Sequence, residues 1–77
     1  MHKSEFFRKL ESILELEPGA IQPQTRLDGL EAWDSLSVIT FIAMADRDYG
    51  VSVPPKSIVE CQTAEDLADL VAANKAG

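Results

Sequence analysis

Apolar residues in the first quarter of the chain recur every three or four positions, the spacing of one helix face. In residues 4–16 these positions are Phe6, Phe7, Leu10, Ile13 and Leu14. Ser4 is a residue type that caps helix starts. Pro18 and Gly19 are typical of the segment that follows a helix end. The pattern predicts a first helix over residues 4–16.

A second stretch has the same periodicity over residues 35–49. Its apolar positions fall at i, i+3, i+4, i+7 and i+11, which predicts one buried stripe, and they are Val38, Phe41, Ile42, Ala45 and Tyr49. Asp34 is a good N-cap residue, and Gly50 can adopt the left-handed conformation that ends a helix. We therefore expect a second helix over residues 35–49.

The last third of the chain predicts one short and one longer helix. Val51-Ser52-Val53 alternates like a strand but has no partner strand, and Pro54-Pro55 interrupts it. A short helix over residues 56–60 fits next. Thr63 can cap a last helix over 63–74, with Leu67, Leu70 and Val71 on its apolar face. The fold class is all-α: a small four-helix bundle of three main helices and one short helix, in a single domain over residues 1–77.

A long irregular segment, Glu17 to Trp33, separates the first two predicted helices and contains two Pro and two Gly residues. Ile21, Leu27 and Leu30 recur within it and, with Trp33, can attach it to the core. Structureless loops longer than about 12–15 residues are uncommon in small domains and are often functional. The residues at the end of this loop are therefore candidates for a functional site.

Composition narrows the class of partner. The 77 residues carry a net charge of -6, which argues against nucleic acid and anionic membranes and favours basic protein partners. No apolar stretch is long enough to span a bilayer, and no signal peptide is visible. With one cysteine, Cys61, no intrachain disulfide can form. We expect a cytoplasmic monomer without membrane insertion, with Cys61 packed as a small hydrophobe rather than reactive.

Catalysis by the chain itself is not expected. A serine nucleophile needs a base within hydrogen-bond reach, and the one histidine is His2, near the terminus. One Cys and one His make no zinc-type ligand set, so no metal site is predicted. Ser35 lies at a helix start, where the helix dipole and backbone N–H groups favour a phosphate. Taken alone, Asp-Ser at a helix start is most often an ordinary cap, and the residues by themselves leave both interpretations open.

Trp33-Asp34-Ser35-Leu36 resembles the Asp-Ser-Leu signature of acyl carrier and peptidyl carrier domains. The likeness extends in order through the loop with Ile21, Thr25 and Leu27, the Asp48-Tyr49-Gly50 helix end, Val51-Ser52-Val53-Pro54, and Thr63-Ala64-Glu65-Asp66-Leu67. The resemblance implies a bundle of acyl-carrier-protein type that is not an enzyme. It implies phosphopantetheine attached to Ser35 by a phosphopantetheinyl transferase, with Asp34 and Leu36 beside it. An acyl- or aminoacyl-loading ligase and downstream acyl-transfer enzymes are the implied further partners.

The chain departs from the family pattern in two ways that bear on its pathway. Trp33 stands where many carriers have Gly, and the second helix is poor in the Glu residues of fatty-acid-type carriers. We therefore expect a specialised lipid, polyketide or nonribosomal peptide pathway rather than housekeeping fatty acid biosynthesis. The predicted docking surface for partners consists of Leu36, Ile39, Thr40, Ala43 and Arg47.

Several alternatives remain at this level. The chain fits, less well, a helical protein-interaction domain that keeps the carrier-like fold without modification, and a small hydrolase less well again. Trp33 either orients Ser35 and the arm or anchors the loop to the core. Cargo is fatty acyl, polyketide or aminoacyl, and a pocket lined by Phe41, Ile42, Ile58 and Leu67 is predicted to shelter a long acyl chain.

Overall fold

Helices account for the regular structure of residues 2–74, which are the residues that the computed structural model describes. In chain order they are α1 (Lys3–Ile13), the 3-10 helix η1 (Leu27–Gly29), α2 (Ser35–Tyr49), α3 (Pro55–Val59) and α4 (Ala64–Asn74). The all-α prediction is confirmed. The outermost residues of the predicted domain, 1 and 77, lie outside the described part. None of the helices in 2–74 is long and apolar enough to cross a membrane.

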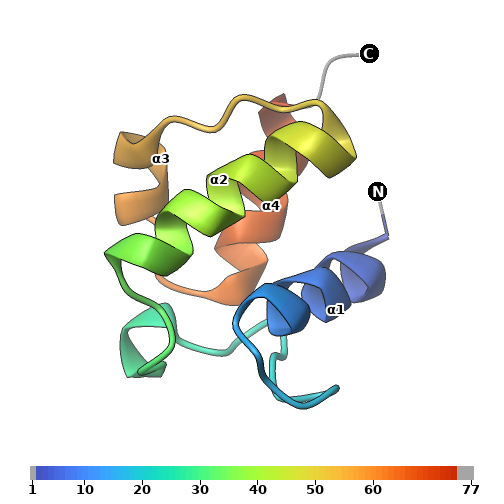
Figure 1. Cartoon of the computed structure of the whole chain (residues 1–77), viewed down its shortest axis with the longest axis vertical. Coiled ribbons are helices and arrows are strands. Elements are labelled where there is room, and N and C mark those ends of the chain that lie inside the picture. Colours follow the sequence, from blue (N-terminus) through green and yellow to red (C-terminus); the bar gives the residue numbers. More distant parts are fainter. Residues whose placement is uncertain (1, 75–77) are drawn as a thin grey trace.

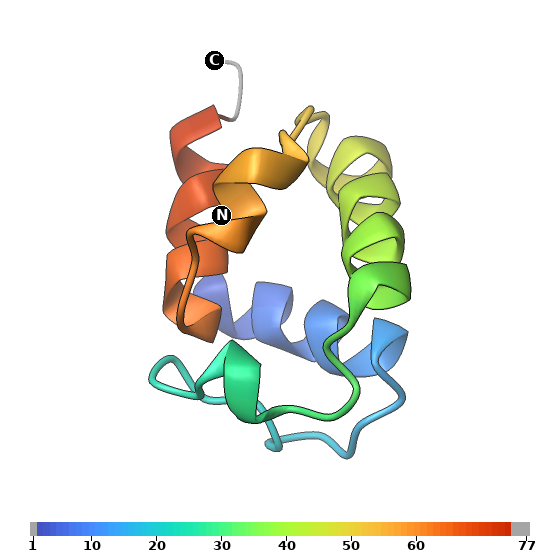
Figure 2. The ribbon, with the colours of Figure 1, turned by 90° about the vertical axis from the view of Figure 1, so that its left-hand side faces the viewer.

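The four α-helices follow one another around a common centre (Figures 1 and 2). α1 packs against α2 and α4, and α3 packs against the same two helices. In Figure 2, α1 forms the base, α2 and α4 rise from its two ends, and α3 lies between them at the top. The segment between α1 and α2 runs below α1 and returns upward to the start of α2.

The core fills the space between these helices. Phe6 is at its centre, with ring centroids 6.0 Å from Phe41 and 6.1 Å from Tyr49. The largest fully buried side chains are Phe6, Phe41, Leu10, Ile21, Ile58, Leu67, Val51 and Val71. They come from all four α-helices and two connecting segments, so detaching any one helix from the bundle would expose part of this core.

α1 begins one residue earlier and ends three residues earlier than predicted. Its N-cap is His2, without a side-chain capping bond, and Ser4 lies inside the helix instead of capping it. The helix reaches back because the amide of Phe6 already bonds the carbonyl of His2, at 3.1 Å. The sequence pattern continues to Leu16 because Leu14 and Leu16 still pack against the core after the helix has ended.

The end of α1 is set by Glu15 rather than by Pro18 and Gly19. Glu15 has a φ of 58°, in the left-handed region. The amide of Glu15 bonds the carbonyl of Ser12 at 3.2 Å, and that of Leu16 bonds the carbonyl of Glu11 at 2.8 Å. This pair of bonds is the Schellman arrangement, in which glycine is the usual left-handed residue.

α2 has the predicted bounds. Asp34 caps it and Gly50, at φ 65°, closes it in the left-handed conformation. Phe41 and Ala45 are buried as predicted, whereas Val38, Ile42 and Tyr49 are half-buried, and Met44, which the predicted stripe omitted, is buried. The buried stripe is therefore rotated slightly, because both α1 and α3 pack against this helix.

α3 begins and ends one residue earlier than predicted, and α4 begins one residue later than predicted. Pro55 opens α3, where a proline needs no hydrogen-bond donor. The predicted cap of α4 is confirmed, since the hydroxyl of Thr63 accepts from the amide of Asp66 at 3.2 Å. Asp66 accepts in return from the amide of Thr63 at 3.1 Å. The segment before α3 forms no strand within 2–74, and its alternation instead buries Val51 and Val53 against the core.

The irregular segment between α1 and α2 is fastened to the bundle on two sides. On one side, the buried carboxylate of Glu11 accepts from the amides of Gly19, at 2.9 Å, and Ile21, at 2.8 Å. On the other side, three backbone bonds of 2.9–3.0 Å join it to the first two residues of α4 and to Gln62, two residues before that helix. They run from Leu27 N to Gln62 O, from Ala64 N to Thr25 O, and from Glu65 N to Pro23 O. These attachments fix the path that the chain takes to α2.

Candidate functional site

The start of α2 is built around the side chain of Asp34. The residue is extended, with φ -135° and ψ -172°, and its Oδ1 atom accepts from the amide of Ser37 at 2.9 Å. Its carbonyl oxygen accepts the first helical bond, from the amide of Val38 at 3.0 Å. Asp34 therefore acts as the N-cap that the sequence predicts, and it leaves the next residue, Ser35, as the first of the helix.

Ser37 connects this cap to the incoming loop. Its hydroxyl donates to the carbonyl of Ala32 and lies 3.1 Å from Oδ1 of Asp34. The sequence reading did not single out Ser37. The signal was its position three residues after a capping residue, where a polar side chain commonly reaches back toward the cap. Ser37 is thus a positioning residue for the turn that carries Ser35.

Ser35 lies exposed at the first position of α2. Within residues 2–74 its hydroxyl makes no hydrogen bond, in contrast to that of Ser37. The positive end of the helix dipole and the amides of the first turn favour an anionic group at such a position. An accessible hydroxyl and a cationic helix end are the chemistry that a phosphodiester requires, so these residues fit a phosphopantetheine group.

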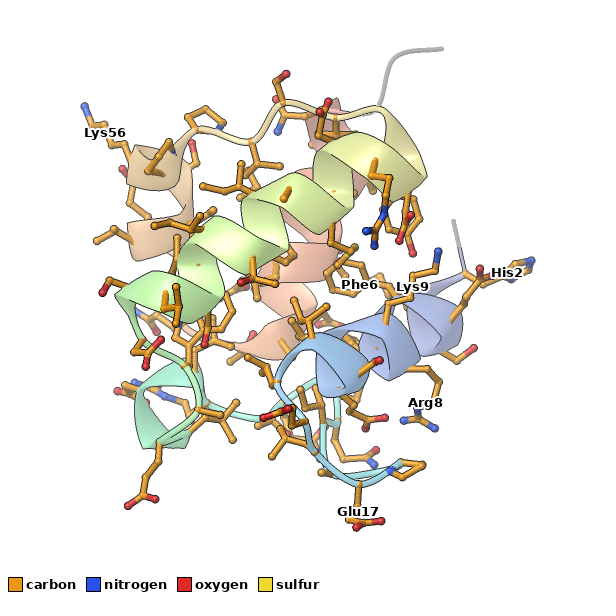
Figure 3. The ribbon with its side chains drawn as sticks, viewed as in Figure 1. His2, Phe6, Arg8, Lys9, Glu17 and Lys56 are labelled. Atoms are coloured by element: carbon orange, nitrogen blue, oxygen red, sulfur yellow. The ribbon has the colours of Figure 1, made fainter. Side chains whose placement is uncertain are left out.

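The carboxylate of Asp34 is suited to capping and poorly suited to proton transfer. The amide and then the hydroxyl of Ser37 stabilise its ionised form and lower its pKa below the ordinary value of 3.8. A carboxylate with a lowered pKa is a weaker base. His2 lies at the opposite side of the molecule from the start of α2 (Figure 3). The structure therefore brings no histidine from its described residues to Ser35.

Trp33 anchors the loop to the core. Its ring lies edge-on to Phe41, with centroids 6.0 Å apart, and it is half-buried against the core cluster. Of the two roles predicted for Trp33, the contact supports this structural one. By holding the residue before Asp34, it also fixes where α2 begins.

All five residues of the predicted docking surface are exposed on α2. Leu36 and Ile39 are 71% and 64% exposed, and Thr40, Ala43 and Arg47 are exposed with them. Thr40 donates to the carbonyl of Leu36 at 3.1 Å, and Arg47 donates to Asp48 at 3.1 Å. The sequence reading missed Val59 on α3, which is 81% exposed. A helix of five residues is too short to give a periodic signal that tells which of Ile58 and Val59 faces outward.

The predicted cargo pocket is not open in this structure. Phe41, Ile58 and Leu67 are buried in contact with the core, Ile42 is half-buried, and residues 2–74 enclose no cavity. Cys61 is half-buried, and its thiol donates to the carbonyl of Ser57 at 3.5 Å. Burial raises the pKa of this thiol, which fits the predicted packing role. No cluster of metal-ligating side chains occurs in the described part of the chain.

A capped helix start that presents a free serine, reached by an anchored loop on a small helical bundle, defines a class of carrier domain. A family model described as "Phosphopantetheine attachment site" matches residues 5–71, and the chain belongs to this family. The acyl carrier proteins of two strains of Tropheryma whipplei, Twist and TW08/27, are each 31% identical to it over 62 residues. The alignment covers 79% of this chain and 74% of each relative.

A solved structure shows the same fold. The solution NMR structure of a holo acyl carrier protein from Geobacter metallireducens matches with a TM-score of 0.77 and 21% sequence identity. The match covers 96% of this chain and 86% of that one. This structural match shows the fold, and the family match with the relatives shows a non-catalytic carrier protein with a phosphopantetheine attachment site. A carrier domain of this kind requires a phosphopantetheinyl transferase and enzymes of its pathway as partners.

Proposed function

We propose that Ser35 is the attachment residue and that the chain carries an acyl or aminoacyl group on it as a phosphopantetheine thioester. The hydroxyl oxygen of Ser35 forms a phosphoester bond to the phosphopantetheine phosphate. The diphosphate bond of coenzyme A breaks, adenosine 3′,5′-bisphosphate leaves, and the hydroxyl proton is lost. The bound group supplies a thiol on a long arm, and this thiol holds the cargo.

The observation that carries the proposal is the free, exposed hydroxyl of Ser35 at the capped start of α2. Asp34 positions the helix start through the amide of Ser37. Since its lowered pKa makes Asp34 a weak base, the base that removes the Ser35 proton belongs to the transferase. Leu36, exposed beside Ser35, offers that enzyme an apolar contact.

The test is the intact mass of the protein after incubation with coenzyme A, magnesium and a broad-specificity phosphopantetheinyl transferase. Wild type should gain one phosphopantetheine, and Ser35→Ala should gain none while keeping its helical circular dichroism spectrum. Ser4→Ala is the matched control, because Ser4 is also exposed in the first turn of a helix. Modification of Ser35→Ala, or its loss in Ser4→Ala, would overturn the assignment.

Partner enzymes dock, in this proposal, on the exposed side of α2 next to Ser35. Leu36, Ile39, Thr40, Ala43 and Arg47 supply that surface. The cargo-loading enzyme is an acyl- or aminoacyl-activating ligase, and downstream acyl-transfer enzymes receive the cargo. The carrier acts as a monomer in the cytoplasm, where the free thiol of Cys61 stays reduced.

The pathway we propose is a specialised lipid, polyketide or nonribosomal one. Support comes from α2, whose acidic residues are Asp46 and Asp48 alone, and the Asp48 carboxylate is paired with Lys9 and Arg47.

The cargo pocket that we propose is closed in this structure, because Phe41, Ile58 and Leu67 are all buried in one packed core. A long acyl chain can enter this core only if its side chains move apart. If the core does shelter it, thermal stability should rise with the length of the loaded acyl chain, because a bound group stabilises the folded state. Equal melting temperatures for short and long chains would refute this shelter.

A further inference from the structure

The turn that leads into α2 is attached to that helix at three consecutive residues. The carbonyl of Ala32 accepts a hydrogen bond from the hydroxyl of Ser37. The ring of Trp33 lies edge-on to Phe41, with centroids 6.0 Å apart. Oδ1 of Asp34 accepts from the amide of Ser37 at 2.9 Å. We call these three contacts the turn clamp.

The two residues of α2 that form the clamp lie on one side of the helix. Ser37 and Phe41 are four positions apart, a spacing that places their side chains on the same face. Phe41 is buried on that face and Ser37 is half-buried. Ser35 is exposed, and its side chain points to a different side because it is two positions before Ser37. The clamp therefore holds the turn on the core side of α2 and leaves the Ser35 side chain outside.

The segment that ends in this turn needs such contacts to keep one conformation. It passes below α1 to reach α2 (Figure 2), and apart from η1 it has no helix or strand of its own. Fixing the backbone of an irregular segment costs conformational entropy. Contacts that order the turn in the free protein remove this cost from any later step that needs the ordered form. A glycine in place of Trp33 would bring no ring to Phe41 and would add backbone freedom.

We propose that Trp33 and Ser37 are positioning residues for the transfer of phosphopantetheine to Ser35. The inference rests on the proposed role of Ser35 as the attachment residue. In that step the Ser35 oxygen bonds to the phosphorus that carries the pantetheine, and the diphosphate bond of coenzyme A breaks. Adenosine 3′,5′-bisphosphate leaves, and the hydroxyl proton passes to the transferase.

The geometry of this step explains why a fixed turn matters. The attacking and leaving oxygens must lie roughly in line, so a Ser35 oxygen that wanders with its turn reaches this alignment less often. Trp33 and Ser37 act through the turn, and neither belongs to the exposed surface that we propose for docking. Losing the clamp should therefore slow the bond-forming step and leave binding of the transferase nearly unchanged.

The experiment measures the single-turnover rate at which the protein gains one phosphopantetheine, followed by intact mass. Coenzyme A and magnesium are in excess, and the concentration of a broad-specificity transferase is raised to saturation. The variants are Trp33→Gly, Trp33→Phe, Ser37→Ala, Ser37→Thr and the double variant Trp33→Gly with Ser37→Ala. Val71→Ala is the control for general loss of stability, because Val71 is buried in the core on α4.

Circular dichroism melting sets an assay temperature at which the compared variants are folded. Ser37→Ala keeps the backbone amide that bonds Asp34, and with it the cap of α2. It therefore tests the proposal even where Trp33→Gly does not fold. Trp33→Phe keeps an aromatic ring for Phe41, and Ser37→Thr keeps a hydroxyl for Ala32, so these two variants test rescue.

Trp33→Gly and Ser37→Ala should each lower the saturating rate by about fivefold or more, with half-saturating transferase concentrations within about twofold of wild type. Trp33→Phe and Ser37→Thr should recover most of the rate. The double variant should lose less than the product of the two single losses, because both contacts hold one turn.

Two results would overturn the positioning role: wild-type rates in the folded clamp variants, or an equal loss of rate in Val71→Ala. A change confined to the half-saturating concentration would also overturn it, since Trp33 and Ser37 would then act in docking. Modification that persists in Ser35→Ala is a distinct result, because it overturns the attachment proposal itself and this inference with it.

Discussion

Replacing Glu11 should destabilise the protein more than any other single charge removal on α1. Glu11 is a charged residue with only 2% of its surface exposed. Its Oε2 atom accepts from the amides of Gly19 and Ile21 and from Arg8, and Oε1 lies 2.7 Å from Nε of Arg8. Glu11→Ala removes the acceptor for all of these donors at once.

The loss of stability depends on how well water can replace Glu11 as the hydrogen-bond acceptor for each donor. The amide of Ile21 is buried, and a buried donor left without a partner costs about 1–3 kcal/mol. Gly19 is exposed and Arg8 is half-exposed, so water replaces much of what they lose. Helix propensity does not offset the loss, because Glu and Ala differ by only a few tenths of a kcal/mol, as a rough figure. We expect Glu11→Ala to lower the free energy of unfolding by about 2–4 kcal/mol.

Urea denaturation of Glu11→Ala measures this loss, with Glu17→Ala as the control because Glu17 is exposed. A loss of that size corresponds to a melting temperature about 10–30 °C lower in a domain of this length. Glu11→Gln keeps one carbonyl acceptor without the charge, so its free energy of unfolding should lie between those of Glu11→Ala and Glu17→Ala. The amide of Ile21 should also exchange with solvent faster in Glu11→Ala. Equal stability of Glu11→Ala and Glu17→Ala would refute the role assigned to this carboxylate.

Three further predictions concern the caps and the core. Glu15→Gly should raise the free energy of unfolding in urea by about 1 kcal/mol, because glycine adopts the left-handed φ of 58° without strain; a loss of stability would contradict the Schellman assignment. Phe41→Ala should lower it by about 3–5 kcal/mol, while the exposed neighbour Thr40→Ala should change it by under about 1 kcal/mol. The pKa values of Asp34 and Asp66 are lowered in the folded protein. Their ionised carboxylates therefore stabilise the fold fully above pH 3.8, and this stability is lost as the pH falls through their pKa values in the folded state. Amide signals of the first turns of α2 and α4 should shift over that acidic range, and Asp34→Asn should remove the shift in α2 alone; unchanged signals would contradict these caps.

The periodic pattern predicted α2 correctly at both ends because the signals there are local. Asp34 supplies the cap with its own side chain, and Gly50 supplies the left-handed stop with its own backbone. The cap of α4 was predictable for the same reason, since Thr63 and Asp66 bond each other across one turn. These local signals placed Ser35 at a helix start, and the resemblance of the surrounding sequence to carrier domains then made it the candidate site.

The predicted C-terminal end of α1 was wrong because tertiary contacts continue the apolar pattern beyond the helix. Leu14 and Leu16 keep the helical spacing of apolar residues, yet they pack against the core from a chain that has already left the helix. Glu15 gives no sequence signal for the end of the helix, because Glu seldom adopts the left-handed conformation. The burial of Glu11 was hidden in the same way, since its amide partners come from residues eight and ten positions later.

The anchored segment before α2 has a consequence for how cargo travels. Glu11, Trp33 and the bonds to the start of α4 hold this segment against the bundle. They therefore also hold the start of α2, where we propose that the arm is attached. In that proposal, the distance that the cargo explores is set by the length of the arm and by rotation of the whole carrier. An enzyme that binds the carrier therefore also fixes the position of the attachment point. Its active site must then lie within one arm's length of that point.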